Sequence, residues 1–203
     1  MNFRDAWTQI RSMKHYLIAT TLVFVASLVM GAVNSEQYAW LIDSQLEALK
    51  KIAETALSDS KGWTSLFWTI FLNNARAALI FIVSGIFFGI PSLALLIMNG
   101  ITIGYISVVT TQQQSLTTLL KGIVPHGVLE LPAIIVASAL GLRLGILLAK
   151  WVVSLASPKR SSLAWTQLRG FGASLLPLFI VIVIVLLVAA LIESTLTFTL
   201  IKG

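Results

Sequence analysis

The sequence predicts an all-α polytopic membrane protein with about five transmembrane helices, amphipathic interfacial helices and one broken or re-entrant helix at Pro125. Hydrophobic residues make up 57% of the 203 residues. Charged residues make up only 11%, against roughly 25% in a typical soluble domain. Mean hydropathy is +0.92, and the apolar residues gather in long runs. So few charges cannot coat a soluble globule, which excludes a soluble enzyme and a disordered chain.

The charge and cysteine content narrow the expected partners. The net charge of +6 comes from a shortage of acids, and no run of Lys and Arg forms a nucleic-acid patch. A nucleic-acid partner is therefore not expected, whereas the lipid bilayer is. The chain has no cysteine, which excludes disulfides, thiolate metal sites and cysteine nucleophiles.

The amino-terminal residues 1–16 are basic and space Phe3, Trp7 and Ile10 at helical intervals. This spacing predicts a short cytoplasmic amphipathic segment on the membrane surface. The first transmembrane helix is predicted over residues 17–33. The Gly31-Ala32-Val33 triplet also imitates a cleavage site, so a cleaved signal peptide is the alternative to an uncleaved span.

Residues 34–62 form the only long polar stretch, and acidic residues outnumber lysines in it. Apolar residues recur in it at steps of four and three, as on one face of a helix. They are Ile42, Leu46, Leu49, Ala53 and Ala56. We predict an extracytoplasmic amphipathic helix that packs on the same chain, lies on the membrane or docks a partner.

Residues 63–203 are predicted to form a membrane core with four further spans. The second span covers about residues 64–90. Pro91 is expected to end it, because proline lacks a backbone N–H and disfavours a helical conformation in the residue before it. The third covers residues 92–110 and leads to a polar turn at 111–115. The next apolar run, residues 116–124, is too short to cross at about 1.5 Å per residue. It is therefore interpreted as a re-entrant half-helix that ends at Pro125.

The fourth span is predicted over residues 128–155 with a kink at Pro132, and the fifth over 172–192. A basic loop, residues 157–170, joins them and contains no acid. Because basic residues favour the cytoplasmic side, the amino terminus and this loop are predicted to be cytoplasmic. The acidic 34–62 segment and the carboxyl terminus then lie outside. The predicted location is the cytoplasmic membrane.

Several polar side chains fall within the predicted spans, where an ionised group costs roughly 2.5–3.5 kcal/mol at mid-helix. They form a candidate functional or structural cluster of Asn73, Asn74, Arg76, Asn99, His126, Glu130, Arg143 and Glu193. Arg76 keeps its proton and needs a partner, and Glu130 is the candidate. A structural ion pair between them is the first expectation. A functional acid or an ion path is the alternative.

His126 and Glu130 are four residues apart and share a helical face if both are helical. A zinc site usually needs three protein ligands, so we predict no metal. His126 is expected to cap the helix start or to hold the broken backbone through hydrogen bonds, and a protonation switch is the alternative.

Three G-x-x-x-G pairs predict close helix contacts and favour a compact bundle or a homodimer. They are Gly85 with Gly89, Gly100 with Gly104, and Gly141 with Gly145. The sequence contains neither the G-x-S-x-G nor the H-E-x-x-H motif. We predict no catalytic residue and no cofactor, and an intramembrane hydrolase remains the remote alternative.

Five motifs follow one another in an order that resembles the stage II sporulation protein M family. They are F-L-N-N-A-R-A-A-L at Phe71–Leu79, N-G-I-T-I-G at Asn99–Gly104, P-H-G-V-L-E-L-P-A-I-I at Pro125–Ile135, G-L-R-L-G at Gly141–Gly145 and I-E at Ile192–Glu193. The resemblance implies a membrane scaffold that recruits stage II sporulation proteins P and D, which carry the activity on peptidoglycan, during engulfment.

Two functions follow as hypotheses. The first is a non-enzymatic scaffold for peptidoglycan remodelling, docked through the 34–62 segment. The second is a small transporter, channel or sensor that uses the buried polar cluster.

Overall fold

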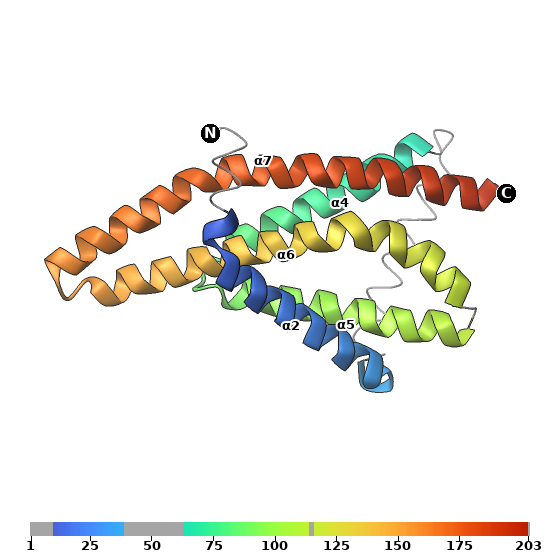
Figure 1. Cartoon of the computed structure of the whole chain (residues 1–203), viewed down its shortest axis with the longest axis horizontal. Coiled ribbons are helices and arrows are strands. Elements are labelled where there is room, and N and C mark those ends of the chain that lie inside the picture. The colour runs from blue at the N-terminus through green and yellow to red at the C-terminus, as the bar shows by residue number, and fades with distance from the viewer. Residues whose placement is uncertain (1–9, 39–62, 114–115, 203) are drawn as a thin grey trace.

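The computed structural model describes residues 10–38, 63–113 and 116–202, and for residues 113, 116–126, 128 and 197–202 it describes the backbone alone. Five long α-helices make up this part of the chain (Figure 1). They are α2 (Lys14–Val33), α4 (Trp63–Ser84), α5 (Ile90–Gln113), α6 (Leu116–Ser154) and α7 (Pro158–Lys202). Each contains a segment long and apolar enough to cross a membrane, so the predicted all-α class and the five spans are confirmed.

Helix α6 lies at the centre of the bundle, with α4 and α7 on one side and α2 and α5 on the other (Figure 1). It packs against all four other helices, and more than half of its membrane span is buried. The outer helices expose many large apolar side chains, as lipid-facing helices do. The residues of α6 therefore face protein on most sides, which makes α6 the element best placed to hold polar groups.

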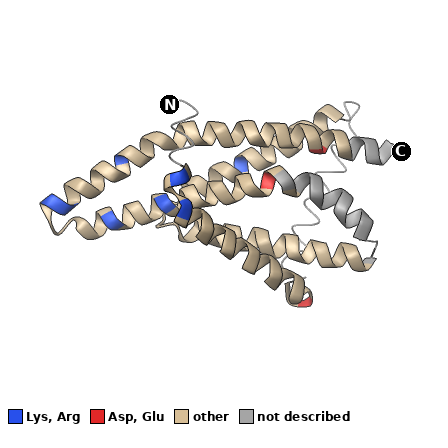
Figure 2. Ribbon diagram, in the orientation of Figure 1, with Lys and Arg blue, Asp and Glu red and all other residues tan. Residues whose placement is uncertain are grey.

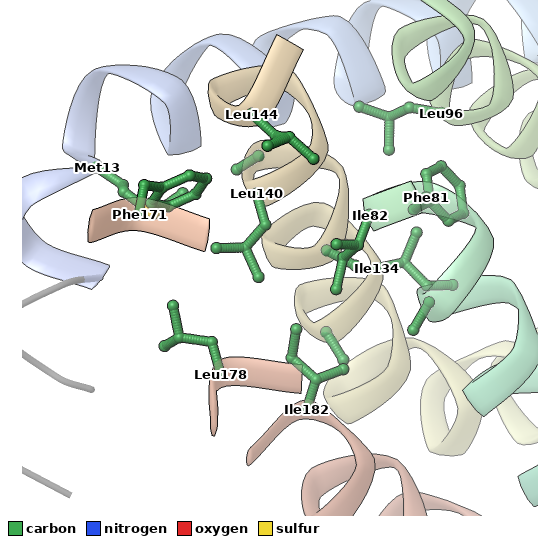
Figure 3. Close-up of a cluster of buried hydrophobic side chains, with 14 of the residues drawn as sticks. Met13, Phe81, Ile82, Leu96, Ile134, Leu140, Leu144, Phe171, Leu178 and Ile182 are labelled. Atoms are coloured by element: carbon green, nitrogen blue, oxygen red, sulfur yellow. The ribbon is translucent and has the colours of Figure 1, made fainter. Parts of the chain in front are cut away.

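The core joins four helices and the segment before α2 around the middle of α6. Leu140 and Leu144 of α6 meet Met13 and Phe171 on one side (Figure 3). Further along α6, Ile134 lies near Phe81 and Ile82 of α4 and Ile182 of α7. Met13 is completely buried and Ile10 packs against the same core, so residues 10–13, called here the segment before α2, are part of the packed bundle.

The second span ends earlier than predicted. Helix α4 stops at Ser84, and a tight turn over residues 85–89 leads straight into α5. Phe88 and Gly89 both have positive φ, at 58° and 78°, and reverse the chain. Pro91 therefore lies in the first turn of α5 instead of ending α4. Proline fits there because the first helical N–H groups have no partner within the helix.

The half-helix predicted for residues 116–124 is wrong, because α6 runs without a break from Leu116 through Pro125 and Pro132 to Ser154. The prediction assumed that a proline ends the helix. Inside a membrane an interrupted backbone leaves several polar groups unsatisfied, whereas a proline within a helix removes one hydrogen bond. The polar turn is also shorter than expected, because α5 continues to Gln113.

The basic loop predicted for residues 157–170 is also helical. Only residues 155–157 separate α6 from α7, which begins at Pro158 and includes Pro177. Residues 146–170, named here the α6–α7 hairpin, project beyond the other helices at one end of the molecule (Figure 1). The prediction failed because the basic residues were assumed to lie outside a helix, whereas polar and charged residues are compatible with a helix outside the hydrocarbon layer.

Two predicted amphipathic segments fall mainly outside the described residues. Residues 1–9 belong to the first segment, and residues 39–62 contain every position of the predicted apolar stripe, Ile42, Leu46, Leu49, Ala53 and Ala56. The docking role assigned to that stripe stays a prediction.

Candidate functional site

The three polar residues of the Phe71–Leu79 motif have different surroundings. The Asn74 side chain is buried in the bundle, with 6% of its surface exposed. Asn73 and Arg76 are exposed on the surface of α4. The helical repeat explains the difference, because residues three apart share a face whereas neighbouring residues point about 100° apart. Asn74 thus belongs to the interior, and Asn73 and Arg76 form part of the outer surface.

Glu130 is the most deeply buried ionisable residue in the described part of the chain, with 0% of its surface exposed. It lies on α6, within the stretch that is hydrophobic enough to span a membrane. A carboxyl group buried at this depth is costly unless protein groups compensate it. Burial on the central helix places Glu130 among protein side chains and away from lipid.

Asn74 and Glu130 lie at the same level of two packed helices. Gly85, the residue directly after α4, touches the backbone of Gly141 of α6, and both helices run in the same direction. Asn74 precedes Gly85 by the same number of residues as Glu130 precedes Gly141. That interval, eleven residues, is about three helical turns, so each side chain returns to the face that holds its glycine. The buried amide and the buried carboxyl group therefore belong to the contact between α4 and α6.

The predicted ion pair between Arg76 and Glu130 does not form. Arg76 is exposed on α4, whereas Glu130 is completely enclosed, and no described acidic side chain makes an ion pair with Arg76. The pairing was inferred from the similar depths of the two residues. Depth alone does not fix the direction in which a side chain points, and Arg76 lies on a different face of α4 from Asn74.

The Asn99 and His126 side chains have no described contact with Asn74 or Glu130. Asn99 lies on α5, and its buried Oδ1 atom has no hydrogen-bond partner among the described residues. The backbone of His126 is part of α6, and its side chain lies outside the described part. The capping role predicted for His126 is wrong, because α6 begins ten residues earlier, at Leu116.

Arg143 lies at the other end of α6 and joins three segments. Its Nη1 atom donates a 3.0 Å hydrogen bond to the Ser12 hydroxyl. The guanidinium group also lies over the Phe171 ring of α7, 4.6 Å from its centre. Arg143 therefore holds the segment before α2 against the α6–α7 pair. The sequence analysis did not identify Ser12 or Phe171, because their contacts with Arg143 span more than a hundred residues or two helices.

Glu193, the last member of the predicted cluster, is half-buried near the carboxyl end of α7. Close to it, Trp63 Nε1 of α4 donates a 3.3 Å hydrogen bond to the Thr195 hydroxyl. Trp63 also begins an aromatic row along α4, with Phe67 stacked at 5.9 Å. Tryptophan side chains are enriched at the membrane–water interface. Glu193 thus lies near one edge of the bundle, separate from Asn74 and Glu130.

All six predicted packing glycines lie against other elements of the same chain. Gly85 and Gly141 meet each other, and Gly145 meets Gly89 of the α4–α5 turn. Gly100 and Gly104 of α5 lie against residues 24–32 of α2. The sequence analysis missed Gly31, which touches the Ile101 backbone. Ser27 and Gly31 form a small-x-x-x-small pair, which is the signal that predicts this contact. These glycines stabilise the bundle itself and provide no argument for a homodimer.

Charge divides the described molecule into two ends. Most of the coloured Lys and Arg residues lie in the half that contains the α6–α7 hairpin, and the coloured acidic residues lie in the other half (Figure 2). Among the residues whose side chains are described, the basic ones are Arg11, Lys14, Arg76, Arg143, Lys150, Lys159, Arg160 and Arg169, and the acids are Glu36, Glu130 and Glu193. Lys121 and Lys202, described by their backbone alone, belong to the start of α6 and the end of α7. We call the two halves the basic end and the acidic end. This asymmetry is the pattern that orients membrane proteins.

The comparisons with known proteins agree with the motifs. The chain is 24% identical over 194 residues to uncharacterized protein MJ0706 of Methanocaldococcus jannaschii, covering 93% of this chain and 84% of that protein. It is also 24% identical over 187 residues to uncharacterized protein MJ0793 of the same archaeon, covering 91% and 95% respectively. No solved structure matches. The family model of stage II sporulation protein M matches residues 20–198, and the chain therefore belongs to this family.

Proposed function

We propose that this protein is a non-enzymatic membrane scaffold that anchors peptidoglycan-remodelling enzymes. The observation that carries this proposal is that two polar side chains, Asn73 and Arg76, are exposed on the outer surface of α4 at a depth where lipid cannot satisfy them. Asn73, Arg76, Ile80 and Val83 follow one another at helical spacing, and all four are exposed. We refer to these residues as the α4 stripe.

The depth of Arg76 along α4 decides what its exposed side chain can contact. At about 1.5 Å per residue, Arg76 lies about 20 Å from Trp63 and about 12 Å from Ser84 along α4. The stretches 66–72 and 77–83 of α4 on either side are apolar apart from Thr69, so the guanidinium group has a long way to reach water. An arginine at this depth normally faces protein or a water-filled cavity. A bundle that buries Asn74 but exposes Arg76 offers a polar contact to another membrane protein.

Family membership supplies the class of partner. The resemblance of the motifs implies recruitment of stage II sporulation proteins P and D, and we propose envelope enzymes of this kind as the partners, in engulfment during sporulation. The proposed location is the cytoplasmic membrane, with the basic end in the cytoplasm and the acidic end outside. The residue 34–62 segment then lies on the side where peptidoglycan is remodelled, and a second copy of the chain is a further candidate partner.

The test of the scaffold function is co-purification from the native membrane. Wild-type protein and an Arg76→Leu variant are solubilised in mild detergent, and the amounts of associated proteins P and D are measured. We expect much less of proteins P and D to co-purify with the Arg76→Leu variant, because leucine lacks the positive charge that would contact the partner. Leu79→Ala, an exposed apolar change on the same helix, is the matched control and should retain the partner.

A second variant separates the two proposed docking regions. Replacing Leu46 and Leu49 by serine disrupts the predicted stripe of the 34–62 segment without touching α4. Loss of partner in this variant alone assigns docking to the extracytoplasmic segment, and loss in Arg76→Leu alone assigns it to the membrane. Full retention of the partners in both variants contradicts the scaffold proposal.

The buried residues of α4 and α6 favour transport or sensing as a second candidate function. Glu130 is fully enclosed and Asn74 lies at its level on the neighbouring helix. A carboxyl group inside a membrane bundle is able to exchange a proton or take a cation. Purified protein in liposomes should then show a proton or cation flux that Glu130→Gln reduces. Flux equal to that of empty liposomes for both proteins contradicts this candidate.

A further inference from the structure

The α6–α7 hairpin carries charge of one sign only. It contains Lys150, Lys159, Arg160 and Arg169, and the sequence has no acidic residue between Glu130 and Glu193. The hairpin extends past the ends of the other helices at the basic end (Figures 1 and 2). Four cations without an acid among them create a positive potential that attracts anions. This part of the protein is thus suited to an anionic partner.

Two of the four cations line a cavity at the turn between α6 and α7. The cavity has a volume of about 420 Å³. Its polar rim includes Lys150 of α6, Ser157 of the turn and Arg160 of α7, and its apolar wall includes Ile146, Ala149 and Val153 of α6. Lys159 and Arg169 do not line it. The cavity therefore combines donors for a phosphate group with an aliphatic surface.

The start of α7 adds to the positive character of this rim. Pro158 is the first residue of α7, and the Ser161 N–H donates a 2.9 Å hydrogen bond to the Ser157 carbonyl. The free N–H groups of the first helical turn and the helix dipole favour an anion at this end. Lysine and arginine side chains provide the charge that a phosphate needs.

The cavity lies where the apolar span of α6 ends. That span covers Leu129–Ser154, and the cavity is lined by its last turns, by Ser157 of the 155–157 turn and by Arg160 of α7. The end of a membrane span reaches the headgroup layer of a bilayer. Trp151 and Trp165 pack with their ring centroids 5.2 Å apart and their planes inclined by 43° in the same hairpin, and tryptophans are enriched at the membrane–water interface.

We propose that this cavity binds the phosphate group of an anionic phospholipid from the leaflet at the basic end of the protein. Lys150 and Arg160 hold the phosphate, and the Ser157 hydroxyl donates to one of its oxygens. The lipid glycerol and upper acyl chain lie along Val153, which is 80% exposed in the absence of a partner. An aliphatic wall next to the cations distinguishes a lipid from a soluble phosphate. The hairpin thus fixes the height of the bundle in the membrane.

The experiment measures retention of lipid by the purified full-length protein. Native mass spectrometry follows titration with phosphatidylglycerol, and with phosphatidylcholine as the zwitterionic reference. We expect preferential retention of phosphatidylglycerol. A Lys150→Gln, Arg160→Gln double variant should bind phosphatidylglycerol about 10- to 30-fold more weakly, since each basic residue near anionic lipid contributes appreciably.

The matched control is the Lys159→Gln, Arg169→Gln double variant. It removes the same charge from the same hairpin but leaves the cavity rim intact, and it should weaken binding by less than about threefold. Equal losses in the two double variants overturn the proposal, because they indicate a general attraction to surface charge. No loss in the rim variant also overturns it. All four side chains are exposed, so both variants should keep the wild-type unfolding temperature.

Two further measurements identify the ligand, and neither of them uses the Lys150→Gln, Arg160→Gln variant. Inorganic phosphate at millimolar concentration should leave phosphatidylglycerol bound to the wild-type protein. Displacement by inorganic phosphate alone makes the cavity a soluble-anion site and contradicts the lipid assignment. A Lys150→Arg, Arg160→Lys exchange keeps both charges and should retain phosphatidylglycerol within about threefold of wild type. A larger loss contradicts binding through charge at this rim.

Discussion

Gly85, directly after α4, and Gly141 of α6 bring the end of α4 into direct backbone contact with α6. A Cβ atom on Gly85 would lie 2.6 Å from the Gly141 Cα, and one on Gly141 would collide with the Phe81 carbonyl oxygen. Such closeness is possible only without side chains on both sides. The contact also fixes the register that aligns Asn74 with Glu130, and thus determines which polar residues enter the core.

Gly85→Ala should destabilise the protein, because its methyl group has no space beside the α6 backbone. Overpacking of this kind costs typically 1–3 kcal/mol in free energy of unfolding. The measurement is the thermal unfolding midpoint of detergent-purified protein. Gly172→Ala is the control, since nothing lies within 4 Å of a Cβ there, and removing a helical glycine should leave stability unchanged or raise it by up to about 1 kcal/mol. A Gly85→Ala protein as stable as wild type contradicts the close contact.

Asn74 and Glu130 should be energetically coupled, because they share the contact between α4 and α6. A double-mutant cycle with Asn74→Ala and Glu130→Ala should give a coupling free energy of about 0.5–2 kcal/mol, measured from unfolding midpoints. The same cycle with Asn73→Ala provides the control. Asn73 is exposed on another face of α4, so its cycle with Glu130 should be additive within about 0.5 kcal/mol. Additivity in both cycles contradicts the alignment.

Arg143→Ala should release the residues before α2 from the bundle. Its hydrogen bond to the Ser12 hydroxyl and its position over Phe171 would both be lost. A hydrogen bond from a charged group contributes about 1.5–3 kcal/mol, so amide hydrogen exchange at residues 11–17 should accelerate about tenfold or more. Lys150→Ala, an exposed change on the same helix, should leave these amides protected. Unchanged exchange in Arg143→Ala means that Met13 packing alone holds the segment.

The absence of cysteine from the chain makes orientation directly measurable. Lys159→Cys at the basic end and Gln37→Cys after α2 each introduce one exposed thiol. With the amino terminus in the cytoplasm, a membrane-impermeant maleimide should label Gln37→Cys in intact cells and Lys159→Cys only after permeabilisation. The reverse labelling pattern means that the protein is inserted the other way round.

The five spans were predictable from the sequence because hydrophobic length is a local property. The apolar runs around α2, α4, α5, α6 and α7 were all recognised, although several ends were not. Two of these differences concern Pro91 and Pro125, since the local sequence predicts that each proline ends a helix. The effect of a proline depends on whether it lies in the first turn or where the neighbouring helices satisfy the backbone, and the local sequence does not contain that information.

The candidate cluster was predicted as a set of residue types, and the structure separated its members. Asn74 and Glu130 are buried together on α4 and α6, Arg76 faces outward, and Arg143 lies at the basic end. The expected pairing of Arg76 with Glu130 was based on their similar depths in the membrane. The sequence determines the depth of a residue to within about one helical turn. Which way each side chain points depends on the rotation of the helix about its axis.

The sequence by itself determined the membrane class, the number of spans, the family and the positions of the glycines that allow close packing. These follow from composition, the length of apolar runs and ordered motifs, which are all read along the chain. Only the tertiary structure decided that α6 is one central helix, that basic residues 159–169 belong to a projecting helical hairpin, and that Arg76 is exposed while Glu130 is enclosed. The physical reason is that burial and pairing depend on how each helix is rotated against its neighbours, and contacts between distant residues such as Gly85 and Gly141 set that rotation.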